Sequence, residues 1–226
     1  VNNFYLCAYQ TTQEFWQAVV KLRPGINLQE NPSRFNGKTR PVEQVSWDDI
    51  QIFITNLNDI LKEDLKKLSE HKKIKFKDDK TFPSGIFSLP SETQWEFAAL
   101  ANEKFEAQAN KNFMYVRSDN LNDVGWYRNN SNEQTMPVGL KQPNDNGLYD
   151  MSGNVWEWCQ NDYRNIETNG EAGPNQSDAY KTLRGGSYIY QAQYCRLRNR
   201  YNYRPGDRGN DGGFRLRFSP SSENEG

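Results

Sequence analysis

The sequence predicts an α+β domain in which two to three helices accompany small antiparallel sheets and long loops. Three helix-start signals fall within the first 100 residues, and no amphipathic helix pattern follows residue 110. Elsewhere, short apolar runs alternate with turn sequences such as Asn36-Gly37 and Pro205-Gly206. We expect hydrogen bonds to hold the long connections in place, because buried loop amides need partners.

Each helix-start signal is a Ser or Thr followed three residues later by an acidic or amide side chain. The three signals are Thr11-x-x-Glu14, Ser46-x-x-Asp49 and Ser91-x-x-Gln94. The second opens a long helix whose apolar residues repeat with helical spacing from Trp47 to Leu68. Beyond the helices we predict brief strands, among them Thr182–Leu183 and Phe214–Phe218.

Length and charge limit the classes of protein to consider. The chain has 226 residues, enough to bury a sizeable core, and we predict one domain over residues 1–218. We interpret residues 219–226 as a polar tail and the Lys-rich stretch 62–82 as a charged excursion. A formal net charge of -1 provides no overall field for nucleic acid, so we expect no nucleic-acid partner. No run of 18 apolar residues is present, which argues against a transmembrane segment in this chain.

The cysteine and histidine usage gives little support to a metal or nucleophilic centre. The three cysteines, Cys7, Cys159 and Cys195, form no CxxC pair, and the single histidine, His71, lies in the Lys-rich stretch. This pattern argues against zinc fingers and against a Cys-His catalytic pair.

The segment Tyr188–Asp211 has the composition of a binding surface. It holds five of the 12 Tyr and five of the 14 Arg of the chain, and no Lys occurs after Lys181. Tyr and Arg provide rigid or forked contact groups and dominate paratopes and interface hot spots. The phrases RGGS at 184–187 and GGFRL at 212–216 frame the segment, which suggests a changeable surface on a fixed frame. The alternative is that these side chains only cover the core.

Several ordered phrases resemble the formylglycine-generating-enzyme (sulfatase-modifying factor) family. They are YQTTQEFWQAV, NPSRFNGKTRPVEQVSWDDIQIFITNLN, FSLPSETQWEFAAL, NDNGLYDMSGNVWEWCQNDY, RGGSY and GGFRL. The resemblance runs from Phe4 to Phe218 and implies a variant of the C-type lectin fold. Because one fold can carry many functions, the site has to decide the activity.

The enzymes of this family hold a copper ion with two cysteines, and only one of them is matched here. The first falls three residues after the Gly-Gly-Ser phrase and the second five residues later, which are the places of Tyr190 and Cys195. A phenol cannot replace one of two thiolates around a soft Cu(I) ion, so we expect no enzyme activity of this kind. We interpret Cys195 as a buried small residue. A copper-dependent formylglycine-generating oxidase remains the alternative function.

One branch of the family, the variable proteins of diversity-generating retroelements, is more similar to the segment, and the treponeme-type surface protein is the best match within it. In that branch a region between RGGSW-like and GFRL-like phrases is diversified, which would be residues 184–217 here. The interspersed positions that look fixed are Ala192, Cys195, Arg200, Pro205 and Arg208. The expected ligand-binding positions are Tyr188, Ile189, Tyr190, Gln193, Tyr194, Arg196, Arg198, Tyr201, Tyr203, Gly206, Asp207, Gly209, Asn210 and Asp211.

The resemblance to this branch implies a monomeric display protein that requires no cofactor and binds a macromolecule, with protein as the expected class of ligand. We expect the ligand-binding side chains to be mostly exposed on one face. Truncating Tyr201 and Tyr203 should then leave the melting temperature nearly unchanged. Family members usually carry a strand before the phrase FYLCAYQTT. We therefore expect a bacterial surface or secreted protein, lipid-anchored through a missing N-terminal segment.

The resemblance also implies a structural calcium site. In the resembling enzymes, the positions that match Asp150 and Glu157 supply side-chain ligands, and those that match Gly153 and Val155 supply carbonyl ligands. Hard oxygen ligands on a turn suit calcium. The alternative is that the two carboxylates bond loop amides or an arginine.

Overall fold

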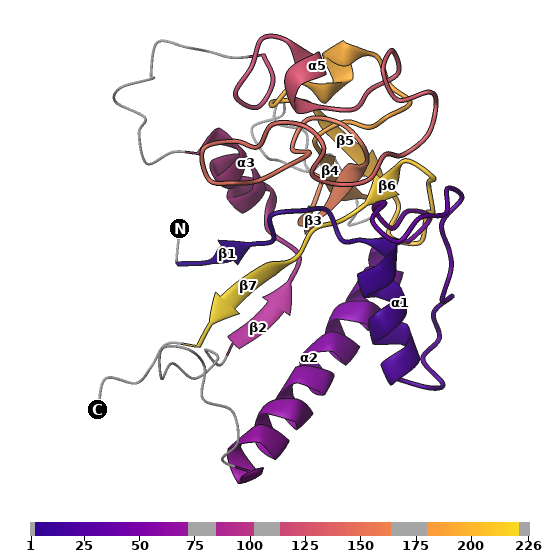
Figure 1. Cartoon of the computed structure of the whole chain (residues 1–226), viewed down its shortest axis with the longest axis vertical. Helices are drawn as coiled ribbons and strands as arrows, with labels where there is room; N and C mark the ends of the chain where they lie inside the picture. Colours follow the sequence, from indigo (N-terminus) through magenta and orange to yellow (C-terminus); the bar gives the residue numbers. More distant parts are fainter. Residues whose placement is uncertain (1–2, 72–84, 102–113, 164–179, 222–226) are drawn as a thin grey trace, which may run out of the picture.

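The computed structural model describes residues 3–71, 85–101, 114–163 and 180–221 (Figure 1). The helices are α1 (Gln13–Leu22), α2 (Trp47–His71), α3 (Glu92–Leu100), α5 (Leu121–Val124) and a 3-10 helix (Ala192–Cys195). The strands are β1 (Tyr5–Leu6), β2 (Gly85–Ser88), β3 (Trp156–Asp162), β4 (Lys181–Arg184), β5 (Arg200–Tyr203), β6 (Gly212–Gly213) and β7 (Arg217–Pro220). Residues 72–82 of the predicted excursion and 222–226 of the predicted tail lie outside the described residues.

Two small sheets organise the fold. The first has the order β1-β7-β2, with both neighbours antiparallel to β7, so the two ends of the described chain lie side by side (Figure 1). The second has the order β5-β4-β3-β6 and is antiparallel except for the pair β3 and β6. None of the helices within the described residues combines the length and the apolar composition that crossing a bilayer requires.

Two of the three predicted helix caps form as expected. The Ser91 hydroxyl accepts the Gln94 N–H at 3.1 Å, and the Gln94 side chain accepts the Ser91 N–H at 2.9 Å. Ser46 and Asp49 make the same reciprocal pair at 2.9 and 3.1 Å. These local bonds fix where α3 and α2 begin, because they satisfy N–H groups that have no partner inside the helix.

The cap predicted at Thr11 is displaced by one residue. The Thr12 hydroxyl accepts the Phe15 N–H at 3.4 Å and therefore caps α1. Thr11 is buried and belongs to the extended chain before the helix, since its N–H donates to Phe214 O and its carbonyl accepts the Val42 N–H. Tertiary hydrogen bonds, which a local pattern does not contain, decide between the two threonines.

The strand predicted at Phe214–Phe218 is also corrected. Its residues are divided between irregular chain at 214–216 and the strand β7, while β6 ends at Gly213. Here the chain passes from one sheet to the other, and the carbonyls of Phe214 and Leu216 accept N–H groups of Thr11 and Cys7. The four-residue helix α5 was not predicted, because so short an element shows no apolar period.

The main core lies between α1, α2 and the four-stranded sheet. Trp16 and Phe53 stack with ring centroids 4.8 Å apart, and Phe214 meets both rings edge-on. Trp156 and Trp158 of β3 are fully buried against the same cluster. The tryptophans of β3 therefore connect the helical core to the surface of the sheet.

A buried ion pair joins β3 to the end of the chain. Glu157 and Arg215 are both fully buried, and two hydrogen bonds of 2.7 Å link the guanidinium to the carboxylate. Trp95 of α3 donates to the same carboxylate at 2.7 Å. The remaining Arg215 N–H groups donate to the carbonyls of Cys7, Ala8 and Tyr149. One side-chain pair thus ties the N-terminal segment, α3, β3 and the chain before β7 together.

We predict that Arg215→Met destabilises the protein by about 3–5 kcal/mol, because it leaves the Glu157 carboxylate buried without its cation. The measurement is urea unfolding followed by tryptophan fluorescence. Lys38→Met is the control, since Lys38 is 81% exposed and lies 3.9 Å from Glu14. The control should cost less than about 1 kcal/mol. Equal losses in the two variants would show that the buried pair does not hold the fold.

Candidate functional site

The Tyr- and Arg-rich segment, residues 188–211, begins near α5 and continues past β5 to the start of α2, where the Pro205 carbonyl accepts the Asp48 N–H (Figure 1). It comprises the 3-10 helix, β5 and the loop that leads to β6. Gly186 in the preceding phrase has a φ of +81°, and a Cβ there would lie 2.6 Å from Cys195 Cα. A glycine is therefore needed where the segment folds back on its own start.

Arginines fix the segment to the scaffold. Arg184, fully buried before the segment, donates to Glu92 at 2.8 Å, to Glu96 at 3.1 Å and to the carbonyl of Leu197 at 2.8 Å. Arg200 bonds Glu92 at 2.7 Å, so α3 holds β5 as well. Arg208 forms a two-bond pair with Asp49 at the start of α2, at 2.7 and 2.8 Å. Arg200 and Arg208 had both been predicted as fixed positions.

Three tyrosines of the segment, Tyr190, Tyr201 and Tyr203, form a half-buried cluster on the tryptophans of β3. We call this set the tyrosine cluster. Tyr201 stacks on Trp156 with centroids 5.4 Å apart and an interplanar angle of 18°. Tyr190 meets Trp156 edge-on at 6.0 Å, and Tyr203 lies 5.8 Å from Trp158. Each of these rings is partly exposed to solvent and partly packed on the tryptophans and on the neighbouring tyrosines.

Two predicted ligand-binding residues are buried, which corrects the expectation that the set is mostly exposed. Tyr188 is 1% exposed and packs edge-on against Phe35 at 5.5 Å. Its N–H donates to the carbonyl of Asn154, so it belongs to the frame. Asp211 is 5% exposed and accepts the Tyr203 hydroxyl at 3.1 and 3.3 Å. Both residues lie beside the glycine phrases, where the backbone is tied to the scaffold.

The remaining predicted positions divide by exposure. Five of the positions are half-buried, namely the tyrosine cluster, Gly209 and Asn210. The exposed positions are Ile189, Gln193, Tyr194, Arg196, Arg198, Gly206 and Asp207. Half of the fourteen predicted positions are thus open to solvent. The structure brings the tyrosines together but does not expose the whole set.

Sequence reasoning missed Glu43, which lies near the buried end of this surface. Glu43 is fully buried, and its Oε1 accepts the Phe35 N–H at 2.9 Å. Its Oε2 has no hydrogen-bond partner among the described residues. Burial raises the pKa of Glu43 to about 7, and the neighbouring charge of Asp211 also favours the protonated acid. No sequence signal marks this residue, since a single Glu between valines in PVEQV looks like an exposed loop residue.

The place that copper would take in the family enzymes has a different character here. Cys195 is fully buried in an apolar cluster, and its Sγ lies 3.8 Å from the carbonyl of Ser187. Burial raises the pKa of the Cys195 thiol to about 12, as for a buried structural cysteine. Tyr190 packs on Trp156 instead of offering a second sulfur. These donors do not fit a two-thiolate copper site.

The predicted calcium ligands lie together, but their oxygens surround a protein side chain. The side-chain amide of Gln10 points into the space between these oxygens, which we call the oxygen cage. Its Nε2 lies 3.0–3.3 Å from the carbonyl oxygens of Asp150, Gly153 and Val155 and from Glu157 Oε1. A calcium ion would need the place that this amide nitrogen holds. As arranged, the residues do not fit calcium.

The carboxylates of the same turn have other partners. Asp150 accepts the Gly139 N–H at 2.8 Å, and Glu157 is bonded to Arg215 and Trp95. Burial raises the pKa of Asp150 to about 6, and the nearby Glu157 charge contributes in the same direction. This is in part the alternative that the sequence left open, since a loop amide and an arginine bond the carboxylates, but Asp150 Oδ1 is buried without a hydrogen-bond partner among the described residues.

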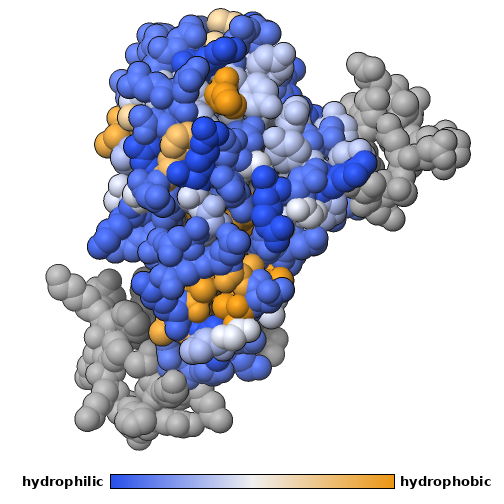
Figure 2. Space-filling view, turned by 90° about the vertical axis from the view of Figure 1, so that its right-hand side faces the viewer, coloured by the Kyte–Doolittle hydropathy of each residue, from blue (hydrophilic) through white to orange (hydrophobic). Residues whose placement is uncertain are grey.

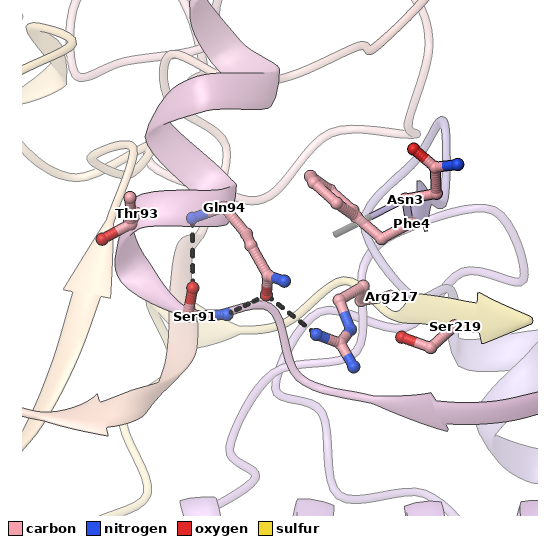
Figure 3. Close-up of a pocket in the computed structure, with 7 residues that line it drawn as sticks. All are labelled: Asn3, Phe4, Ser91, Thr93, Gln94, Arg217 and Ser219. Atoms are coloured by element: carbon pink, nitrogen blue, oxygen red, sulfur yellow. Dashed lines mark hydrogen bonds between the residues drawn. The ribbon is translucent and has the colours of Figure 1, made fainter. Parts of the chain in front are cut away.

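Two hollows and an apolar patch also lie on the surface of the described residues. The first hollow, about 440 Å³, lies between the start of α3 and β7 (Figure 3). Gln94 and Arg217 on its wall bond each other at 3.1 Å, and it includes no residue of the segment. The second, about 550 Å³, has Arg208 on its wall. Figure 2 shows an apolar patch on the lower half of the face that carries α1. On α1 itself, Phe15 and Leu22 are exposed.

The fold and the site define a class of protein: a loop-rich α+β domain whose buried polar network supports an aromatic and arginine-rich surface. The sequence matches the model of the sulfatase-modifying factor enzyme 1-like domain family over residues 1–218. The chain belongs to this family.

The chain is also similar in sequence to individual known proteins. The chain is 31% identical to chaperone protein LppX of Paenibacillus barcinonensis, over 84% of this chain and 70% of that protein. It is 33% identical to the formylglycine-generating enzyme of Streptomyces coelicolor, over 50% of this chain and 38% of the enzyme. The matched region thus spans well under half of that enzyme.

Solved structures confirm the predicted α+β, C-type lectin-like fold of the formylglycine-generating-enzyme subclass. Treponema denticola variable protein 1 matches with a TM-score of 0.66 and 28% identity, over 94% of this chain and 84% of that chain. CarF matches with a TM-score of 0.69 and 25% identity, over 97% and 87%. PvdO from Pseudomonas aeruginosa has a TM-score of 0.67 at 22% identity, over 96% and 80%, and shows the fold alone.

We predict that Tyr201→Ala and Tyr203→Ala each lower the free energy of unfolding by about 1–3 kcal/mol, because each removes a half-buried ring from a tryptophan. This replaces the expectation of an unchanged melting temperature. Tyr194, which is 42% exposed and whose ring lies 5.4 Å from that of Tyr190, is the comparison residue, and Tyr194→Ala should cost less than about 1 kcal/mol. Urea unfolding of the three variants checks this. A double Tyr201/Tyr203 variant as stable as the parent would contradict it.

We predict that the melting temperature of the protein is the same in excess calcium and in excess EDTA, because Gln10 holds the oxygen cage. Gln10→Glu should lower the free energy of unfolding by about 2–4 kcal/mol, because it replaces the donating amide with a carboxylate that is surrounded by four acceptor oxygens. Calcium should recover part of that loss. Gln17→Glu, a change on the surface of α1, is the control and should not respond to calcium. Calcium stabilisation of the unmodified protein would show that a cation can displace Gln10.

Proposed function

We propose that this protein is a ligand-binding display protein whose segment 188–211 contacts a macromolecular ligand, with protein as the class. The observation that carries the proposal is the tyrosine cluster, which is half-exposed and rests on buried Trp156 and Trp158. Aromatic groups held this firmly lose little conformational freedom on binding. The exposed Tyr194, Arg196 and Arg198 extend the same segment with contact groups typical of hot spots.

Diversification of the segment by a retroelement is part of this proposal. The similarity to a treponemal variable protein supports it. The exposed positions can change without altering the buried frame, whereas Tyr188 and Asp211 cannot be exchanged as freely. The proposal requires a near-copy of the coding region for residues 184–217, differing at adenines, beside a reverse-transcriptase gene.

A copper-dependent oxidase is the competing function, and the family membership supports it. The tyrosine at position 190, which leaves Cys195 as the single thiol at the two matched positions, weighs against it. We therefore propose a role in binding and not in catalysis.

We also propose an exported or cell-surface location in a bacterium and a monomeric state. A display role requires contact with ligands outside the cell, and the bacterial relatives, LppX and the treponemal variable protein, support this setting.

The proposal is tested by selecting phage-displayed random peptides on the immobilised chain. We expect enriched peptides that lose binding to a Tyr194→Ala/Arg198→Ala double variant, because both side chains are exposed contact groups of the segment. Both substitutions should leave the melting temperature within about one degree or two of the parent. Tyr5→Ala/Lys38→Ala is the control, since both residues are exposed on other parts of the molecule. Selected peptides that bind the two double variants equally would refute the segment as the binding surface.

A further inference from the structure

The charge beneath the tyrosine cluster indicates what kind of group the surface accepts. Two carboxylates, Asp211 and Glu43, are buried there at 5% and 0% exposure. The described residues provide neither carboxylate with an ion pair to Lys or Arg. A buried carboxylate is normally paired, because leaving it without a cation is costly. Burial raises the pKa of both carboxyl groups, that of Glu43 to about 7, so without a cation they are shifted toward the protonated acid, and a cation of a ligand would favour their charged form.

The negative charge reaches the tyrosine rings. The Tyr203 hydroxyl donates to Asp211, which places this carboxylate directly behind the cluster. Burial raises the pKa of Tyr203, and the Asp211 charge raises it further. The pKa of Tyr190 is raised by burial, by its hydrogen bond with Tyr201 and by the same Asp211 charge. The field of Asp211 is thus felt at two rings of the cluster.

Glu43 adds to this field from the neighbouring loop. Its charge and that of Asp211 raise the pKa of the buried Tyr188, after burial itself, to about 12. The nearby cation is Arg34, whose guanidinium lies over the Phe35 ring at 5.3 Å, and its charge opposes both shifts without forming an ion pair. Glu133 contributes a further negative charge near Tyr188. Acidic groups therefore outnumber the basic one around this end of the surface.

The rings themselves are arranged to receive a cation. Their centroids lie 6.0 Å apart for Tyr190 and Tyr201 and 5.3 Å apart for Tyr201 and Tyr203, with interplanar angles of 56° and 86°. Rings at such different angles present both faces and edges at one place. A cation gains from the electron-rich faces, and the gain is larger where water is excluded.

We propose that the tyrosine cluster binds a cationic group of the ligand, an arginine or lysine side chain, in front of the buried carboxylates of Asp211 and Glu43. This inference rests on the proposed function and deepens it by naming the class of contact group. A guanidinium can stack on a tyrosine and still keep hydrogen bonds at its edge. The exposed Arg196 and Arg198 do not neutralise the carboxylates, so they remain for other parts of the ligand.

The probe is Nα-acetyl-arginine methylamide, compared with its uncharged isostere Nα-acetyl-citrulline methylamide. The protein is labelled with 3-fluorotyrosine, and single Tyr→Phe variants assign the fluorine resonances. We expect the arginine derivative to shift the resonances of Tyr190, Tyr201 and Tyr203 in a saturable manner. Its affinity should exceed that of the citrulline derivative by about tenfold or more, because only the charged group gains from the rings and the carboxylates.

Asp211→Asn removes the charge and keeps an oxygen that can accept the Tyr203 hydroxyl. We expect this variant to weaken binding of the arginine derivative by about tenfold and to leave the citrulline derivative unaffected. Asp207→Asn is the control, since Asp207 is an exposed acid of the same segment. Glu43→Gln is the second variant, in case Asp211→Asn disturbs folding, and the melting temperature of each variant is recorded.

Three results would overturn the inference: equal affinity for the two derivatives, unchanged arginine affinity in both charge-removing variants, or shifts confined to tyrosines outside the cluster. Absence of any shift up to the solubility limit counts against it as well. None of these results would by itself refute the proposed function, which is tested separately by the selected peptides. If peptides selected on the segment lack a required cation but still depend on Tyr194 and Arg198, the binding surface stands and only its cationic preference is wrong.

Discussion

The structure depends on one buried ion pair, that of Glu157 and Arg215. Removing both charges from water is costly, and the cost is offset only because every side of the pair is bonded. Trp95 and Gln10 donate to the carboxylate, and three backbone carbonyls accept from the guanidinium. In a fold with short strands and long loops, this network provides the contacts between distant segments that longer sheets provide in other folds. It holds the chain ends, α3 and β3 in one arrangement.

The binding surface follows from that arrangement because β3 carries both the ion pair and the tryptophans. Glu157 faces the network, while Trp156 and Trp158 on either side support the tyrosine cluster. Arg200 and Arg208 attach the segment to α3 and α2. The tyrosines therefore pack against the sheet, and in the proposed function they also serve as contact groups. A surface of this kind can vary at its exposed positions but less freely at its aromatic base.

The candidate site was only partly accessible to sequence reasoning. The concentration of Tyr and Arg between two glycine phrases identified the segment, and the tyrosine at position 190 identified the loss of a copper ligand. Burial of Tyr188 and Asp211 was not predicted, since composition does not say which side chains point inward. Glu43 was missed because it is far from the segment in sequence. Gln10 was missed for the same reason, although it takes the place expected for calcium.

The sequence by itself determined two of the three helix starts and the family. Both are recorded in residues close together along the chain, such as the reciprocal caps at Ser46 and Ser91. Tertiary structure alone decided the strand limits after Gly213, the cap at Thr12 and the acidic base of the surface. The physical reason is the distance along the chain over which each interaction acts. Caps use hydrogen bonds three residues apart, whereas burial and charge at the site arise from segments that meet only when the chain has folded.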